Sequence, residues 1–199
     1  MTEAERAEQN RAYQEAADIV KKEMPLDARA DAPSPGWLAR RRLSRAISLF
    51  ERVVQLNPAN WLAFWLMGKV HLRLQNHDSA LACFERAHEA NPAQPDILRE
   101  ASRCAMDLGL HDAALDFAQR AVQMSPNNPA LRANLALACL VAGRLPDAQL
   151  AATQAVMGDP NDEPSRQLKA MVEHFSTEGI TPPETPVELF EYWQKHGGN

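Results

Sequence analysis

The sequence predicts an all-α array of antiparallel helix pairs, and three observations support this prediction. A residue followed by proline recurs every 34 positions, at Asn57, Asn91, Ser125 and Asp159. Glycines recur with the same spacing at Gly109 and Gly143, where the first helix of a pair should end. The composition is also rich in Ala, Leu, Arg, Gln and Glu, which favour helices.

The first helix is expected over residues 2–23, followed by a loop over Pro25 to Pro35. Residues 37–58 then fit the second half of a first helix pair, with apolar positions at Ala46, Phe50 and Val53. The stretch directly before this half is too rich in proline to be helical. We therefore expect the helix at residues 2–23 to supply its missing partner.

Three complete repeats follow, and each places small and large apolar residues at matched positions. The second repeat carries Phe64, Met67, Gly68, His71, Ala80, Phe84, Ala87 and Pro92. The third carries Leu98, Ala101, Ser102, Ala105, Ala114, Ala118, Ala121 and Pro126. The fourth carries Arg132, Leu135, Ala136, Cys139, Ala148, Ala152, Ala155 and Pro160. Small residues at matched positions allow the two helices of a pair to approach closely.

The boundaries of these helices are also marked. Pro95 and Pro129 are expected to open the first helices of repeats three and four, because proline suits a first helical turn. Asp78 and Asp112 lie 34 residues apart in the first turn of the second helices, where the helix dipole favours a carboxylate. Pro146 takes this place in the fourth repeat.

The two ends of the array differ from its repeats. After Pro160, Pro164 opens a helix that we expect to cap the array, since a terminal repeat lacks a neighbour. A proline-rich link and a short final helix over residues 187–196 follow. The predicted division is residues 1–35 for the N-terminal helix and loop, 36–160 for the array, 161–178 for the capping helix, and 179–199 for the link and final helix.

In period and residue order, the segment from Ser44 to Pro160 resembles the tetratricopeptide repeat (TPR) family. The resemblance implies a right-handed superhelical array, a TPR-like α-solenoid with non-repeat terminal helices. Four positions that are typically aromatic in the family hold His71, Leu98, Arg132 and Cys139 instead, which alters packing detail only.

The fold implies a binding groove lined by the first helix of each repeat. We expect the lining residues to be Leu62, Trp65, Lys69, Arg73, Asp96, Arg99, Arg103, Ala130, Ala133, Asn134 and Leu137, with Glu100 as a further candidate. The cations would hold carboxylates or carbonyls of a peptide, beside an apolar anchor at Trp65. The alternative is that Arg99 and Arg103 only form ion pairs within their own helix. A TPR subfamily grips the terminal carboxylate of chaperone tails, but Trp65, Glu100 and Ala130 depart from its residue set, and this function is not predicted.

Net charge, apolar runs and cysteine spacing argue against several other classes of protein. The 199 residues carry a formal net charge of −5, and the run Arg40 to Arg42 with Arg45 fits a solvated helix face, so nucleic acid is not an expected partner. No apolar run is long enough to span a membrane, and the N-terminus lacks a signal-peptide core, so we expect a cytoplasmic protein. The three cysteines are expected to be buried, reduced thiols.

No enzyme, metal or cofactor is predicted. His77 and His111 lie one repeat apart and are each followed by Asp, which favours a shared role in a turn over a metal pair. Neither a nucleophile elbow nor a zinc-protease motif nor a phosphate-binding glycine loop occurs.

Three functions remain open from the sequence. The chain is an adaptor that binds a peptide or helix in its groove, a dedicated chaperone for a secreted or assembly-prone client, or an oligomerising scaffold that forms a homodimer through its N-terminal or C-terminal helix. The final helix combines acidic residues with the apolar Val187, Leu189, Phe190, Tyr192 and Trp193. We expect it to pack over the last helix as a cap or to fold back onto the groove of its own or a second protomer.

Overall fold

The computed structural model describes residues 1–24 and 34–197, which form ten α-helices and no strand. The all-α fold predicted from the sequence is therefore confirmed. The chain divides into two compact units, an N-terminal unit Met1–Pro92 and a C-terminal unit Ala93–Asn199. This boundary falls inside the segment 36–160 that the repeat pattern assigns to one array, and each unit is described by itself. Within the described ranges, no helix is long and apolar enough to cross a membrane.

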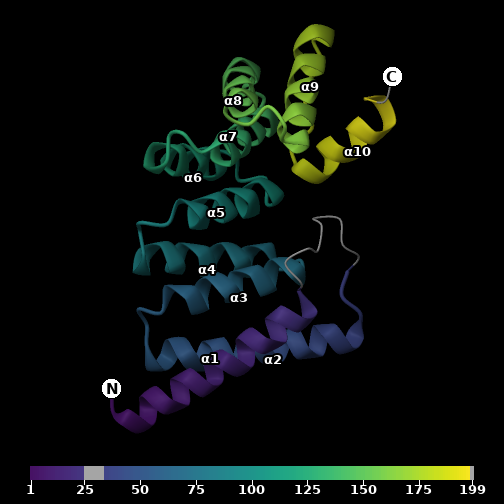
Figure 1. Ribbon diagram of the computed structural model, residues 1–199. Helices are drawn as coiled ribbons and strands as arrows, with labels where there is room; N and C mark the ends of the chain where they lie inside the picture. The colour runs from purple at the N-terminus through teal and green to yellow at the C-terminus, as the bar shows by residue number, and fades with distance from the viewer. Residues whose placement is uncertain (25–33, 198–199) are drawn as a thin grey trace. The chain divides into compact units, whose positions relative to one another are not determined.

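The N-terminal unit consists of two helix pairs. Its helices are α1 (Glu3–Glu23), α2 (Trp37–Leu56), α3 (Trp61–Arg73) and α4 (His77–Ala90), and α1 packs on α2 as α3 packs on α4 (Figure 1). The prediction that the N-terminal helix partners the residue 37–58 segment is thus confirmed. The predicted loop from Pro25 to Pro35 lies, for residues 25–33, outside the described residues.

Helix α1 begins with a capping box. The backbone N–H of Glu5 donates to the Thr2 hydroxyl, and the Thr2 N–H donates to the Glu5 carboxylate at 2.7 Å. These bonds hold the pKa of Glu5 below its usual value, because they favour the ionised carboxylate. Two N–H groups that lack partners inside the helix are thereby satisfied.

Helices α1 and α2 are joined by small buried residues and by ion pairs at the rim. Ala12 and Ala16 are buried on α1, and the ring of Tyr13 meets that of Phe50 edge to face with centroids 5.9 Å apart. Three arginines of α2 form ion pairs with glutamates of α1, namely Arg42 with Glu23, Arg45 with Glu15, and Arg52 with Glu8. Much of the basic run therefore lies on a solvated helix face, as predicted.

The C-terminal unit contains two further pairs and two terminal helices. Its helices are α5 (Pro95–Asp107), α6 (His111–Met124), α7 (Pro129–Val141), α8 (Leu145–Gly158), α9 (Glu163–Glu178) and α10 (Pro186–His196). Pro95 and Pro129 open α5 and α7, as predicted. Helix α9 packs on α7 and α8, where a capping helix should lie.

The turns inside the pairs also follow the prediction. Gly109 and Gly143 have φ of +69° and +71°, a region that L-residues with side chains rarely adopt. After each glycine the chain closes the helix end, since the Leu110 N–H donates to the Ala105 carbonyl and the Arg144 N–H to the Cys139 carbonyl, both at 2.8 Å. The equivalent residue of the N-terminal unit is Gln75, with φ +64°.

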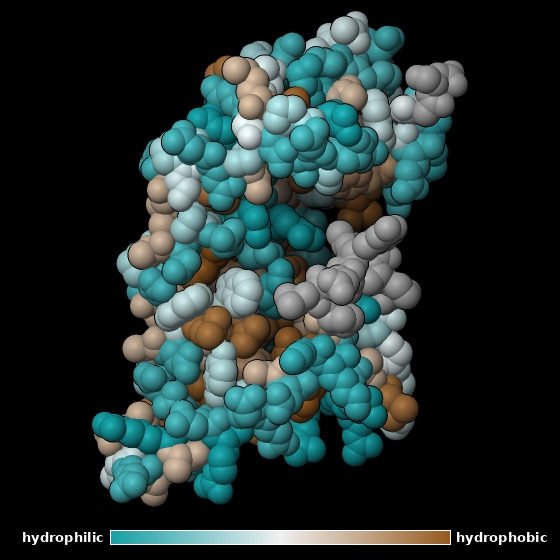
Figure 2. Space-filling view, viewed as in Figure 1, coloured by the Kyte–Doolittle hydropathy of each residue, from teal (hydrophilic) through white to brown (hydrophobic). Residues whose placement is uncertain are grey.

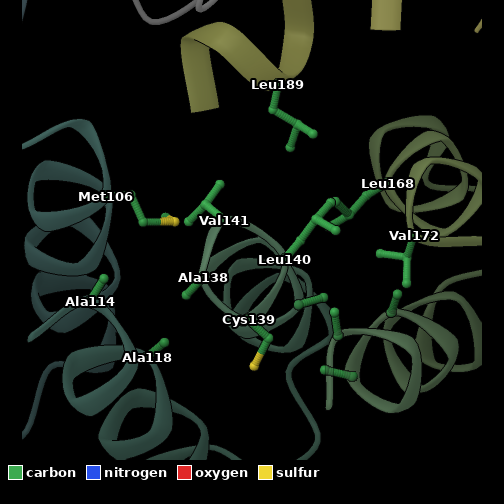
Figure 3. Close-up of a cluster of buried hydrophobic side chains, with 14 of the residues drawn as sticks. Met106, Ala114, Ala118, Ala138, Cys139, Leu140, Val141, Leu168, Val172 and Leu189 are labelled. Atoms are coloured by element: carbon green, nitrogen blue, oxygen red, sulfur yellow. The ribbon is translucent and has the colours of Figure 1, made fainter. Parts of the chain in front are cut away.

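The core of the C-terminal unit combines small residues within the pairs and large ones towards its end. Figure 3 shows Ala114 and Ala118 beside Ala138 and Cys139 of α7. The largest buried side chains of this core include Met106, Leu140, Met171, Phe175 and Leu189. Alanines keep the paired helices close, whereas the large side chains tie α9 and α10 to the helix ends.

Candidate partner-binding surface

In the N-terminal unit, the four predicted groove residues share one side of α3. Leu62, Trp65, Lys69 and Arg73 are each half-buried, and their spacing of three or four residues aligns them along the helix. The Lys69 ammonium lies 5.9 Å from the centre of the Trp65 ring, within the range of a cation–π contact. We call these four residues the α3 face. It joins an aromatic anchor to two cations, and Figure 2 shows apolar surface over α3 bordered by polar surface.

In the C-terminal unit, the predicted cations lie on α5. Arg99 is half-buried and forms an ion pair with Asp96 at 3.2 Å and a longer one with Glu100 at 3.7 Å. Arg103, one turn further on, is exposed, and no ion pair involves it among residues 1–24 and 34–197. The intrahelical alternative therefore describes Arg99, while Arg103 is an exposed residue.

The neighbouring helix α7 contributes small and polar residues. Ala130 is exposed, while Ala133 and Leu137 are half-buried. Asn134 is only 8% exposed, and its amide nitrogen has no hydrogen-bond partner within the described chain. A buried amide donor without a partner is costly unless a ligand or water reaches it. Together, Asp96, Arg99 and Arg103 of α5 and Ala130, Ala133, Asn134 and Leu137 of α7 form what we call the α5–α7 face.

The suggestion that Glu100 lines the groove needs a correction. Glu100 is 4% exposed and lies within the packed side of α5. It occupies the same repeat position as Asn134, 34 residues later, and both are buried because this position faces adjacent helices. The carboxylate of Glu100 therefore contacts Arg99 at 3.7 Å from the packed side of α5 and does not line the surface.

The histidines and cysteines show packing roles. His77 and His111 open α4 and α6, as their shared turn role predicts, and His111 Nε2 also donates to the Glu184 carbonyl at 2.8 Å. Burial lowers the pKa of His71, which fits a neutral packing residue. Cys83, Cys104 and Cys139 are buried and form no disulfide among the described residues, and burial raises the pKa of Cys83 and of Cys139 to about 11. In the part of the chain that the structure describes, no group of three or more metal-binding side chains occurs.

The final helix does fold back onto its own unit. Helix α10 packs on α5 and α7, and its aromatic rings contact α9. Its apolar stripe is split between two environments, because Leu189 is fully buried while Val187 and Phe190 are 61% and 44% exposed. The sequence did not distinguish these residues, which are all apolar and lie within four consecutive positions.

Comparison with protein families agrees with this geometry. One family model described as tetratricopeptide repeat matches residues 38–82 and 66–129, and a second with the same description matches residues 105–172. The chain belongs to the tetratricopeptide repeat family. The TPR resemblance of the sequence and its helix-pair fold are thereby confirmed.

Solved TPR structures share the fold at low sequence identity. A MamA structure is 15% identical with a TM-score of 0.66, covering 94% of this chain and 90% of MamA. YrrB, described as a TPR protein with an unusual peptide-binding site, is 18% identical with a TM-score of 0.60, covering 80% of each chain. The first TPR of Spaghetti (RPAP3), bound to the HSP90 peptide SRMEEVD, is 14% identical with a TM-score of 0.57, covering 61% of this chain and 96% of that one. No curated protein sequence matches the chain.

Proposed function

We propose that this TPR protein is a protein–protein interaction scaffold that binds an acidic peptide or helix on the first helices of its repeats. The observation that carries this proposal is the α5–α7 face. It combines the exposed Arg103, which has no ion pair within residues 1–24 and 34–197, with Asn134 of the neighbouring helix, whose buried amide nitrogen has no hydrogen-bond partner in the same residues. An acidic peptide supplies a carboxylate for the guanidinium.

The α3 face suits the same class of ligand. Lys69 and Arg73 are cationic, and Trp65 and Leu62 offer a partly exposed apolar anchor beside them. Aromatic and arginine side chains carry much of the binding energy in protein interfaces. Two solved relatives with the same fold have peptide-binding descriptions, which supports a peptide as the ligand.

A peptide-display selection on the full chain tests the proposal. We expect the selected peptides to be enriched in Asp and Glu and to bind at least about tenfold more weakly to the Arg99→Ala/Arg103→Ala variant, since hydrogen bonds to charged groups contribute about 1.5–3 kcal/mol each. The matched control is Arg144→Ala/Arg166→Ala, which removes two exposed arginines outside both faces. Peptides without acidic enrichment, or with equal affinity for the two double variants, would contradict the proposal.

The molecular mass of this protein, measured alone and in complex with a bound protein, distinguishes an adaptor from a dedicated chaperone and from an oligomerising scaffold. A constant protomer count and a binding-competent groove are expected for an adaptor. A homodimer that converts to a 1:1 complex with its client would instead indicate a dedicated chaperone. A fixed oligomer that ignores the selected peptides would indicate an oligomerising scaffold, and light scattering coupled to chromatography distinguishes the three.

A further inference from the structure

The C-terminal helix is held by one fully buried side chain. Leu189 projects from α10 towards Met106 of α5, Leu140 and Val141 of α7, and Leu168 of α9 (Figure 3). All five side chains are at most 8% exposed. The three helices thus form an apolar slot, which we call the Leu189 slot, and none of its residues belongs to the α3 or α5–α7 face.

Aromatic rings border this slot on the side of α9. The Tyr192 ring lies 5.1 Å from that of Phe175, and the Trp193 ring lies 5.7 Å from that of His174, centroid to centroid. His174 Nε2 and the Tyr192 hydroxyl are hydrogen-bonded at 3.2 Å. These contacts orient α10 across the end of α9 as well as over the slot.

The approach to α10 is fixed by a backbone contact and by prolines. The carbonyl of Glu184 accepts the hydrogen bond from His111, and Pro182 and Pro186 are buried. The anchors of α10 are then Pro186, Leu189, Tyr192 and Trp193, spaced i, i+3, i+6 and i+7. This spacing places the four anchors on one side of α10, as is usual for an amphipathic helix bound in a groove.

Helix α10 is attached to the unit through one side only. The helix has 11 residues, too few for stable helicity by itself. Among residues 1–24 and 34–197, no ion pair joins it to the rest of the unit. Its outer side keeps Val187 and Phe190 exposed next to Glu188 and Glu191.

We propose that the ends of α5, α7 and α9 form a second binding site, for an amphipathic helix with a leucine at its centre and aromatic residues one turn later. In the isolated chain α10 fills this site in cis. A partner helix of the same pattern binds by taking the place of α10. Because α10 competes for the site, only a partner helix that binds more tightly than α10 can occupy it. The site and its ligand chemistry are defined by the contacts of α10 and do not depend on the peptide function proposed for the two faces.

Binding of a labelled peptide of residues 180–197 to the full-length protein tests this proposal. The receptors are the unchanged chain and its Leu189→Ala variant, in which the competing α10 has lost its central anchor. We expect the variant to bind the peptide at least about tenfold more tightly than the unchanged chain, because an occupied site lowers the apparent affinity for a second ligand. Fluorescence anisotropy gives both dissociation constants.

Two peptide variants provide a matched control at adjacent residues. The Leu189→Ala peptide should lose binding, whereas the Phe190→Ala peptide should bind within about threefold of the unchanged peptide, since Phe190 lies on the outer side of α10. Equal losses from both substitutions would overturn the assigned docking side and with it the proposed site. A Leu189→Ala chain that is folded by circular dichroism and binds the peptide no better than the unchanged chain would also overturn it.

Hydrogen exchange on the unchanged chain decides the matter even if Leu189→Ala fails to fold. We expect the amides of α10 to exchange at least about tenfold faster than those of α7, because a displaceable helix opens without unfolding the repeats. Exchange of α10 and α7 amides at one common rate would show that α10 is an integral part of the core. That result would contradict a site open to a partner helix.

Discussion

The helix pairs α3–α4 and α5–α6 solve the same packing problem with different residues. In α3–α4, Gly68 faces the fully buried ring of Phe84, and a Cβ atom at Gly68 would come within 2.7 Å of that ring. One repeat later these two positions hold Ser102 and Ala118, both fully buried. The Ser102 hydroxyl donates to the Ala114 carbonyl at 2.9 Å across the α5–α6 pair.

The comparison shows that each pair has a small residue at one or both of two facing positions. A ring opposite glycine and a serine opposite alanine both let the helices approach, and the α7–α8 pair does so with Ala136 and Ala152, which are fully buried. The identity of one small residue therefore does not reveal how closely the two helices of its pair pack. Its partner 16 residues later decides what the position tolerates.

The largest expected effect is the loss of the ring in the α3–α4 pair. Phe84→Ala should lower the free energy of unfolding by about 3–5 kcal/mol, because it removes buried contacts and leaves a cavity against a glycine. Urea denaturation measures the loss. The buried thiol of Cys83 gives a second readout, since its pKa of about 11 leaves little thiolate at pH 8 in the folded state. Unchanged thiol labelling at Cys83 and an unchanged denaturation midpoint would show that the ring does not support this pair.

In the α5–α6 pair the expected effect has the opposite cause, namely excess volume. Ala114→Leu should destabilise the protein by about 1–3 kcal/mol, because Ala114 is fully buried where the two helices are close. Ala82→Leu on the exposed side of α4 is the control and should stay within about 0.5 kcal/mol. If thermal unfolding of both variants matches that of the unchanged protein, the close approach at Ala114 is wrong.

A change of sign is expected at Gly68. Gly68→Ala should destabilise the unchanged protein by about 1 kcal/mol, since the overlap with Phe84 outweighs the better helix propensity of alanine. In the Phe84→Ala background the same substitution should be stabilising by up to about 1 kcal/mol, because the overlap is gone. A double-mutant cycle from denaturation curves measures both values, and equal effects in the two backgrounds would exclude the Gly68–Phe84 coupling.

A smaller effect is expected from the hydrogen bond that distinguishes the α5–α6 pair. Ser102→Ala removes the donor to the Ala114 carbonyl and should cost about 0.5–1.5 kcal/mol. The control Ser176→Ala removes an exposed hydroxyl of α9 and should leave the melting temperature unchanged. A Ser102→Ala protein as stable as this control would mean that shape alone, without the hydrogen bond, sustains the pair.

The smallest effect on stability is expected on the proposed binding surface. Arg99→Ala/Arg103→Ala should change the free energy of unfolding by less than about 0.5 kcal/mol, because the Arg99–Asp96 ion pair is partly exposed and the Arg99–Glu100 contact is long at 3.7 Å. Within the described residues, Arg103 takes part in no ion pair. Circular dichroism and thermal unfolding measure this. Substantial unfolding of the double variant would identify the arginines as structural and remove the basis for their role in binding.

Much of the fold could be predicted because its boundaries are set by local chemistry. Pro95 and Pro129 start helices where they stand, and Gly109 and Gly143 end them through a left-handed backbone. The helical spacing of Leu62, Trp65, Lys69 and Arg73 predicts that they share one side, and the structure has this segment as a helix. Such features depend on residues within one or two helical turns.

Features that depend on distant residues could not be predicted in the same way. The burial of Glu100 is set by the helices around it, and its charge suggests the opposite. The choice of Leu189 over Phe190 as the buried residue depends on where α10 meets α5, α7 and α9. The pairing of Arg42, Arg45 and Arg52 with glutamates of α1 likewise required the hairpin geometry.

The contact between Gly68 and Phe84 limits how this chain can be recombined with other TPR sequences. Replacing α3 alone by a helix with serine or alanine at position 68 would drive its side chain into the ring, while replacing α4 alone by one with alanine at position 84 would open a void. Either transfer is unfavourable, whereas moving α3 and α4 together keeps the matched volumes. The smallest exchangeable module in grafting, gene conversion or design is therefore the whole hairpin, so that α3 and α4 are exchanged together.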